Sequence, residues 1–159
     1  MLFIDVATAF YRINRFTVGE PFFGPIDLGL HLAGKYNSLN IGTGLLAGSI
    51  FPGANRLFFN GFSPCWTGFY VSSMGGAGLV FDNVGVNMIS MVNRASVPSI
   101  LYLNRNSGEE VEVRIEPVQI QKVWQEGRRG IYAVMDYTFK RFGEYYSTDP
   151  RILAVGPAS

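Results

Sequence analysis

The sequence predicts an α+β fold, and three observations support this class. Segments rich in β-branched and aromatic residues follow one another in runs and do not alternate strictly with helices. Residues 111–117 place Val111, Val113 and Ile115 on one side and charged residues on the other, as in a strand with one buried face. Two segments, 26–36 and 129–145, have apolar residues at helical spacing. A length of 159 residues is typical of one domain.

The elements of the first part of the chain are predicted from alternation and turn residues. Residues 2–6 and 10–16 are expected to form strands joined by a turn at 7–9, because apolar and polar residues alternate around Tyr11 and Ile13. A loop containing Pro21, Gly24 and Pro25 should lead to the helix, which two glycines weaken. Further strands are expected within 37–44, at 56–62 and at 68–73.

The second part of the chain should begin with a helix of small residues between Gly75 and Val84 that packs closely on a sheet. Segments 86–92, 99–104 and 111–117 are then predicted as a three-stranded meander, with a hairpin turn at 106–108. After the helix at 129–145, a final short strand is expected at 151–155.

Composition excludes several classes of protein. The net charge of +1 argues against nucleic-acid binding, which requires clustered Lys and Arg. The nearest basic group, made of Arg128, Arg129, Lys140 and Arg141, is interspersed with acidic residues. The single cysteine excludes an internal disulfide and any cysteine-based zinc or iron–sulfur site made by this chain alone. No signal peptide or apolar membrane-spanning stretch is expected. With 48% hydrophobic and 16% charged residues, the chain suits either a very stable domain or one with a large covered face.

The stretch from Gly42 to Gly85 is rich in glycine and contains only two charged residues, Arg56 and Asp82. Its glycines do not have the G-x-G-x-x-G spacing of dinucleotide sites, and no Gly-Lys-Ser/Thr follows as in a Walker loop. Glycines let the backbone approach a ligand closely, and an isolated guanidinium is a good partner for an anion. These features favour a surface for a flat or phosphorylated ligand.

Arg56 is the strongest candidate for a binding residue. If strands 56–62 and 68–73 are neighbours, Arg56 and Ser73 share one edge of the sheet with Gly75 and Gly76. The guanidinium fork and the exposed backbone there could bind a phosphate or a polar heterocycle edge. The alternative, a solvated strand arginine without function, is equally compatible with the sequence.

No catalytic residue and no metal ligand are predicted. His31 is the only histidine and has no nucleophile nearby, so a structural role is favoured over catalysis. Cys65 between Pro64 and Trp66 is expected to be a small buried hydrophobe.

Residues 41–85 and the terminal Ala154-Val155-Gly156-Pro157-Ala158 resemble the N-terminal domain of the tungsten-dependent aldehyde ferredoxin oxidoreductase family. GTGLLAGSIFPGANRLFF, SPCWTGFYVSSMGGAG and NVGVNM look most like the glyceraldehyde-3-phosphate-oxidising branch. The resemblance implies two mixed sheets packed together and flanked by helices, and one domain over 1–159 that cradles a tungsten bis-pyranopterin (molybdopterin-type) cofactor. By motif position Arg56, Ser73, Gly75 and Gly76 are the cofactor-binding residues. Ser73 stands where other members often have Asn, so its side-chain contact is less certain than the backbone contacts.

The resemblance also implies what lies outside this chain. Residues 1–159 are expected to be truncated on the C-terminal side of the family's domain, so the [4Fe–4S] cluster and the catalytic carboxylates belong to a C-terminal remainder or a complementary subunit. The complete enzyme would oxidise an aldehyde to a carboxylic acid in the cytoplasm and pass electrons to ferredoxin. A non-catalytic truncated paralogue that serves as a structural or assembly module is the alternative. Homo-oligomer formation is left open.

Overall fold

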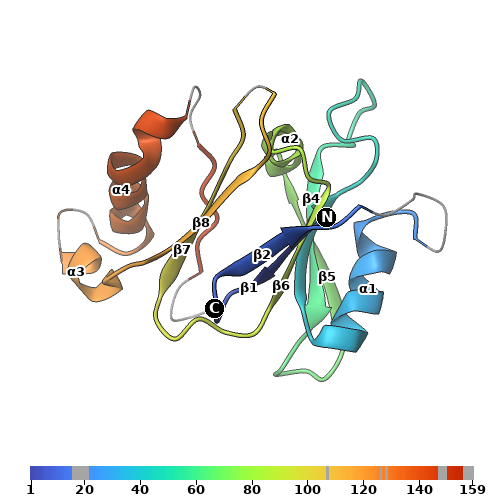
Figure 1. Ribbon diagram of the computed structural model, residues 1–159, viewed down its shortest axis with the longest axis horizontal. Helices are drawn as coiled ribbons and strands as arrows, with labels where there is room; N and C mark the ends of the chain where they lie inside the picture. The colour runs from blue at the N-terminus through green and yellow to red at the C-terminus, as the bar shows by residue number, and fades with distance from the viewer. Residues whose placement is uncertain (16–21, 107, 126, 128, 147–149, 156–159) are drawn as a thin grey trace. The chain divides into compact units, whose positions relative to one another are not determined.

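The computed structural model describes residues 1–15, 22–106, 108–125, 127, 129–146 and 150–155 (Figure 1). It divides into two compact units, Met1–Ser96 with Leu101–Ile115, and Val97–Ile100 with Glu116–Ser159. The strands are β1 (Leu2–Asp5), β2 (Phe10–Ile13), β3 (Leu39–Thr43), β4 (Arg56–Phe62), β5 (Phe69–Gly75), β6 (Met88–Val92), β7 (Ser99–Asn104) and β8 (Glu112–Pro117). The helices are α1 (Pro25–Tyr36), α2 (Ala77–Asn83), α3 (Ile120–Gln125) and α4 (Ile131–Phe142), the last followed by a 3-10 turn, Gly143–Tyr145.

A mixed sheet of six strands, in the order β2-β1-β6-β3-β4-β5, forms the centre of the first unit. β1 and β6 run parallel, and every other neighbouring pair in this sheet is antiparallel. The register pairs Thr43 with Leu57, Gly42 with Met88 and Arg56 with Gly75. The end of β3, the start of β4, the end of β5 and the start of β6 therefore lie at the same end of the sheet. β7 and β8 form a second sheet of two strands, and the predicted α+β class is confirmed.

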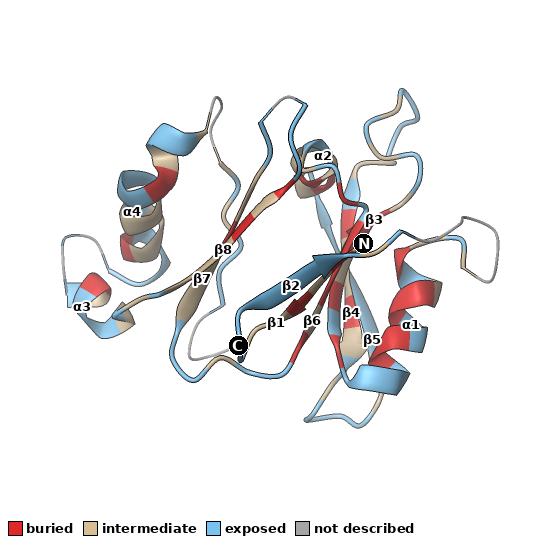
Figure 2. Ribbon diagram, in the orientation of Figure 1, coloured by how far each residue is buried: buried red, intermediate tan, exposed pale blue. Residues whose placement is uncertain are grey.

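One apolar cluster joins the six-stranded sheet to α2 and to the β7–β8 sheet. Its buried members are Leu2, Ile4, Leu57, Phe81, Val86, Ile89, Val111 and Val113. Figure 2 shows the central strands β6 and β3 buried, whereas β2 and β5 at the two edges are mostly exposed. Burying each of these large side chains stabilises the fold by about 1.5–3 kcal/mol relative to an exposed one.

Helix α1 packs through a small apolar cluster, Leu28 and Leu32 with Met88, and through an unusual row of polar residues. Ser90, Asn40 and Asn60 are paired across β6, β3 and β4, and each is at most 2% exposed. The Asn40 side chain donates to the Gly29 carbonyl at 3.1 Å, and the Asn60 side chain donates to the Pro25 carbonyl at 3.0 Å. These bonds join the helix backbone to the middle of the sheet, which requires the helix to lie very close at Gly29.

The first turn of α1 is capped by Asp27. Its carboxylate accepts hydrogen bonds from the backbone N–H of Phe23 at 2.6 Å and of Gly24 at 2.8 Å. Burial alone would raise the pKa of this carboxyl and is the largest single effect. Together, however, the backbone N–H donors lower the pKa below its ordinary value of 3.8.

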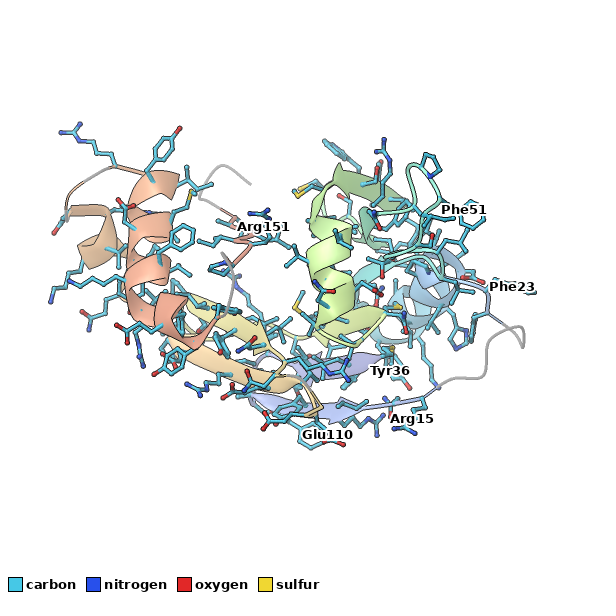
Figure 3. The ribbon with its side chains drawn as sticks, turned by 90° about the horizontal axis from the view of Figure 1, so that it is seen from above. Arg15, Phe23, Tyr36, Phe51, Glu110 and Arg151 are labelled. Atoms are coloured by element: carbon cyan, nitrogen blue, oxygen red, sulfur yellow. The ribbon has the colours of Figure 1, made fainter. Side chains whose placement is uncertain are left out.

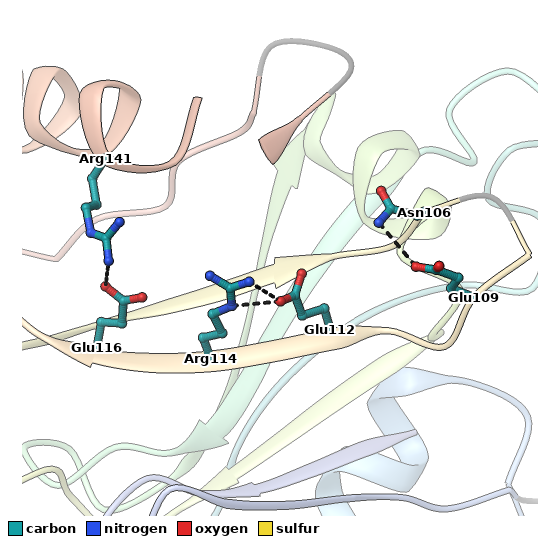
Figure 4. A network of polar contacts seen from close by, with 6 residues as sticks. All are labelled: Asn106, Glu109, Glu112, Arg114, Glu116 and Arg141. Atoms are coloured by element: carbon teal, nitrogen blue, oxygen red, sulfur yellow. Dashed lines mark hydrogen bonds and ion pairs between the residues drawn. The ribbon is translucent and has the colours of Figure 1, made fainter. Parts of the chain in front are cut away.

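The second unit is built around α3 and α4, which pack on each other. Val123, Ala133 and Phe142 are buried in it. Arg141 forms an ion pair with Glu116 at 3.2 Å, and its guanidinium carbon lies 5.3 Å from the centre of the Phe142 ring. Figure 4 shows this pair and, in the first unit, the contacts of Arg114 with Glu112 and of Asn106 with Glu109. Such exposed ion pairs contribute about 1 kcal/mol or less.

Two predictions about the elements were wrong, and one helix was not predicted. The segment 86–92 does not form a meander with β7 and β8, because β6 inserts between β1 and β3 in the large sheet. Residues 151–155 form no strand, and helix α3 was missed. The predicted turn at 106–108 and strand at 10–16 include Ser107 and Phe16, which lie outside the described residues.

Replacing Gly29 with alanine should destabilise the protein, because the new Cβ would lie 1.9 Å from Asn60 Oδ1. We expect the free energy of unfolding, measured in urea, to fall by about 2–3 kcal/mol. Gly34 in the same helix is the matched control, since a Cβ there meets nothing within 4 Å. Gly34→Ala should raise stability by about 0.5–1 kcal/mol, and equal effects at the two sites would contradict this packing.

Asp27 should make stability depend on pH. A lowered carboxyl pKa stabilises the folded state above the ordinary value of 3.8, and this contribution is lost as the pH falls through the lowered pKa. The difference in unfolding free energy between wild type and Asp27→Asn should therefore shrink as the pH is lowered from about 5 to about 2.5. Urea unfolding of both proteins at each pH measures it, and parallel curves would contradict the role of the charge.

Candidate functional site

The candidate site lies where β4 begins and β5 ends. The register places Arg56 opposite Gly75 and Phe58 opposite Ser73, as expected if the two strands are neighbours. The Arg56 guanidinium donates to the Ser73 hydroxyl, with 3.3 Å between Nη1 and Oγ. The structure thus brings together the residues that the sequence singled out, at one edge of the sheet.

The backbone at Gly75 and Gly76 is open to solvent. Both glycines are exposed, and a Cβ on either would meet nothing within 4 Å. Gly76 has a φ of +79°, a left-handed conformation that L side chains rarely adopt, and α2 begins at the next residue. A ligand could therefore approach this backbone without meeting a side chain.

Helix α2 lies directly against the start of β4. Gly78 is buried, and a Cβ there would lie 2.6 Å from the Asn55 carbonyl oxygen and 2.9 Å from the Arg56 carbonyl carbon. Only glycine permits this close approach of helix and strand. The backbone that carries Arg56 is therefore supported from the side of α2.

The Arg56 side chain is exposed, and no acidic residue forms an ion pair with it within the described part of the chain. Because the guanidinium is exposed, water can solvate its charge, and no buried charge forces it to have a partner. Asp82, the other charged residue of this stretch, faces Gly48, where a Cβ would lie 2.8 Å from Asp82 Oδ2. The Arg56 donors consequently remain available to an anionic ligand.

The loop between β3 and β4, which ends directly before Arg56, carries exposed apolar side chains that the sequence analysis did not single out. Leu45, Leu46, Ile50 and Phe51 are all exposed, Ile50 at 97%. Figure 3 labels Phe51 on this loop. The signal was present in the sequence as four large apolar residues within a glycine-rich segment, where packing would normally place them inside.

A cavity of about 460 Å³ also opens at this end of the sheet. It lies within the first unit, and Thr43 and Met88 at the strand ends line it together with Pro25 of α1. Arg15, Phe23 and Glu110, labelled in Figure 3, belong to its walls. No sequence motif indicated this cavity, because its walls come from six segments that are separate in the sequence.

The remaining candidates have ordinary surroundings. His31 is exposed on α1, with its ring centre 5.1 Å from that of Phe22. Cys65 is exposed at the turn between β4 and β5, so the expectation of a buried cysteine was wrong.

Within the described residues, no group of three or more His, Cys, Asp and Glu side chains is placed to hold a metal ion. No helix in the described part of the chain has the length and apolar character needed to cross a membrane.

Comparison with known proteins identifies the class. Residues 2–159 match the aldehyde ferredoxin oxidoreductase N-terminal domain, and the chain belongs to this family. A solved structure of the active site complex BamBC of benzoyl coenzyme A reductase, in complex with 1,5-dienoyl-CoA, has a similar fold. Its TM-score is 0.67 and its identity 19%, over 90% of this chain and 22% of that one.

Two curated relatives are more similar in sequence. The glyceraldehyde-3-phosphate:ferredoxin oxidoreductase of Pyrococcus furiosus is 36% identical over 129 residues, covering 77% of this chain and 20% of the relative. An uncharacterized protein of Methanocaldococcus jannaschii is 32% identical over 157 residues, covering 92% of this chain and 23% of the relative. The chain therefore spans about a fifth of the length of these relatives.

Gly78→Ala should destabilise the protein, because the added methyl group must push α2 away from the Asn55 carbonyl, 2.6 Å from the new Cβ. We expect a loss of about 1–3 kcal/mol in the free energy of unfolding. Gly44→Ala is the control, since a Cβ at Gly44 meets nothing within 4 Å. Thermal and urea unfolding measure both, and a neutral Gly78→Ala would show that α2 is not in close contact with β4.

Proposed function

We propose that residues 1–159 are the N-terminal, cofactor-holding part of a tungstopterin aldehyde:ferredoxin oxidoreductase. Family membership supports the enzyme class. The 36% identity with the Pyrococcus enzyme supports glyceraldehyde 3-phosphate as the substrate. The observation that carries the proposal is the placement of Arg56 beside Ser73 and opposite Gly75, with its guanidinium not paired to a described carboxylate.

These residues fit a phosphate-bearing pterin by their donor chemistry. A guanidinium offers a planar set of N–H donors, which matches a phosphate or the polar edge of a heterocycle. The Ser73 hydroxyl lies 3.3 Å from that guanidinium, and the uncovered backbone at Gly75 and Gly76 lets a bulky ligand come close. A side chain at either glycine would project into the same open space.

The cofactor and this chain have separate roles. A tungsten bis-pyranopterin supplies the two-electron redox chemistry by which an aldehyde and water become a carboxylic acid. In this chain, Arg56 neutralises negative charge on the cofactor and orients it, while Ser73, Gly75 and Gly76 form the surface on which the cofactor binds. None of the four breaks a bond in the substrate.

The other components of the reaction are proposed to lie outside residues 1–159. The relatives are about four to five times as long as the matched region. We assign the [4Fe–4S] cluster, the aldehyde site and the contact with ferredoxin to the remainder of the polypeptide or to a complementary subunit. The exposed, unpaired Cys65 is compatible with a reducing compartment, so we propose the cytoplasm as the location.

Arg56→Ala should weaken cofactor retention without unfolding the protein, because it removes charged hydrogen bonds from an exposed position. We expect the complete protein or complex, isolated from its natural host, to lose pterin about tenfold faster during dialysis. Tungsten and molybdenum are measured by mass spectrometry of the metals, and pterin by fluorescence after oxidation.

Two further variants sharpen this test. Arg56→Lys keeps the charge but loses the planar fork, so it should fall between wild type and Arg56→Ala. Arg94→Ala removes another exposed arginine and should leave retention unchanged. Unchanged tungsten and pterin in Arg56→Ala would remove Arg56 from the site.

A further inference from the structure

Asn55 is the last residue of the loop between β3 and β4 and directly precedes Arg56. Its side-chain oxygen Oδ1 accepts a hydrogen bond from the backbone N–H of Gly48 at 2.8 Å. This bond connects the middle of the loop to the residue that directly precedes β4. Asn55 is half-buried, and its side-chain oxygen bonds to the backbone of the same loop.

Helix α2 contacts the same two residues, Asn55 and Gly48. The backbone of Asn55 lies against Gly78, and the Asp82 carboxylate lies next to Gly48. Gly48 has a φ of +78°, which favours glycine, and a Cβ there would lie 2.8 Å from Asp82 Oδ2, so a larger residue would also have to displace that carboxylate. Gly48, Asn55, Gly78 and Asp82 together form what we call the loop anchor.

The loop anchor fixes the backbone from which Arg56 projects. Arg56 is the first residue of its strand, a position where the ladder of hydrogen bonds ends and the backbone is held on one side only. The contacts of Asn55 supply the missing constraint. An arginine whose backbone is fixed loses less freedom when it binds, so its ligand is bound more tightly.

We propose that Asn55 is a positioning residue for Arg56, which presents the guanidinium at the Ser73–Gly75 edge for binding an anionic, phosphate-bearing cofactor. This inference rests on the proposed function, because Arg56 must first be a cofactor contact. Asn55 itself does not touch the cofactor in this scheme.

The test is a double-mutant cycle in the complete protein or complex, with the rate of pterin loss during dialysis as the readout. The variants are Asn55→Ala, Arg56→Ala and the two combined. If Asn55 acts through Arg56, Asn55→Ala should accelerate pterin loss about threefold in the wild type and add nothing in the Arg56→Ala background. If Arg56→Ala is isolated without pterin, Arg56→Lys replaces it as the background.

Two controls separate positioning from general stability. Asn55→Asp keeps an acceptor oxygen for the Gly48 N–H but adds a negative charge next to Arg56, so its retention should lie between those of Asn55→Ala and the wild type. Ser49→Ala removes a comparable bond in the same loop, the one from the Phe51 N–H to Ser49 Oγ at 3.3 Å, and should leave retention unchanged. Thermal unfolding of every variant reports any loss of the fold.

The outcomes distinguish the positioning role of Asn55 from the cofactor contact of Arg56. An equal effect of Asn55→Ala in both backgrounds, or a similar effect of Ser49→Ala, would overturn the positioning role, since a loosened loop would then explain the loss. Wild-type retention in Asn55→Ala, with rapid loss in Arg56→Ala, would overturn it while leaving the cofactor site intact. Wild-type retention in Arg56→Ala would overturn both.

Discussion

The close contact between α2 and the start of β4 is the constraint on which the candidate site depends. Gly78 brings the helix backbone within van der Waals reach of Asn55 and Arg56, and any side chain there would separate them. The same helix contributes Phe81 to the main apolar cluster and Asp82 to the contact with Gly48. One short helix thus links the core, the loop between β3 and β4, and the arginine at the sheet edge.

Helix α1 is held by a different kind of interaction. Its contact with the sheet is partly polar, through Asn40 and Asn60, whose side chains donate to carbonyl groups of the helix. Such buried bonds add little net stability, but leaving either partner unsatisfied costs about 1–3 kcal/mol. They therefore favour a single position of the helix over others with a similar apolar contact. This fixed position also sets the place of Pro25 in the cavity wall.

The local pattern of the sequence was sufficient for most of the elements and for the adjacency of Arg56 and Ser73. Alternation and turn residues identify strands such as β4 and β5, and a hairpin connection makes them neighbours. The same reasoning failed for β6, because its partners β1 and β3 are distant in sequence and alternation says nothing about pairing. The exposure of Cys65 and the buried polar row under α1 could not be predicted either, since both depend on how distant segments pack against each other.

The apolar residues of the loop before Arg56 offer a way to strengthen ligand binding at this exposed site. A hydrogen bond between a guanidinium and a phosphate is weak in bulk water and much stronger where water is excluded. Leu46, Ile50 and Phe51 are exposed apolar residues of the loop that leads into Arg56, and under the proposed function a bound heterocycle would cover part of this surface. Binding would then remove water from the charged contact at the same time as it forms. A polar loop in the same place would leave Arg56 solvated, so the proposed binding depends on both the arginine and the apolar loop.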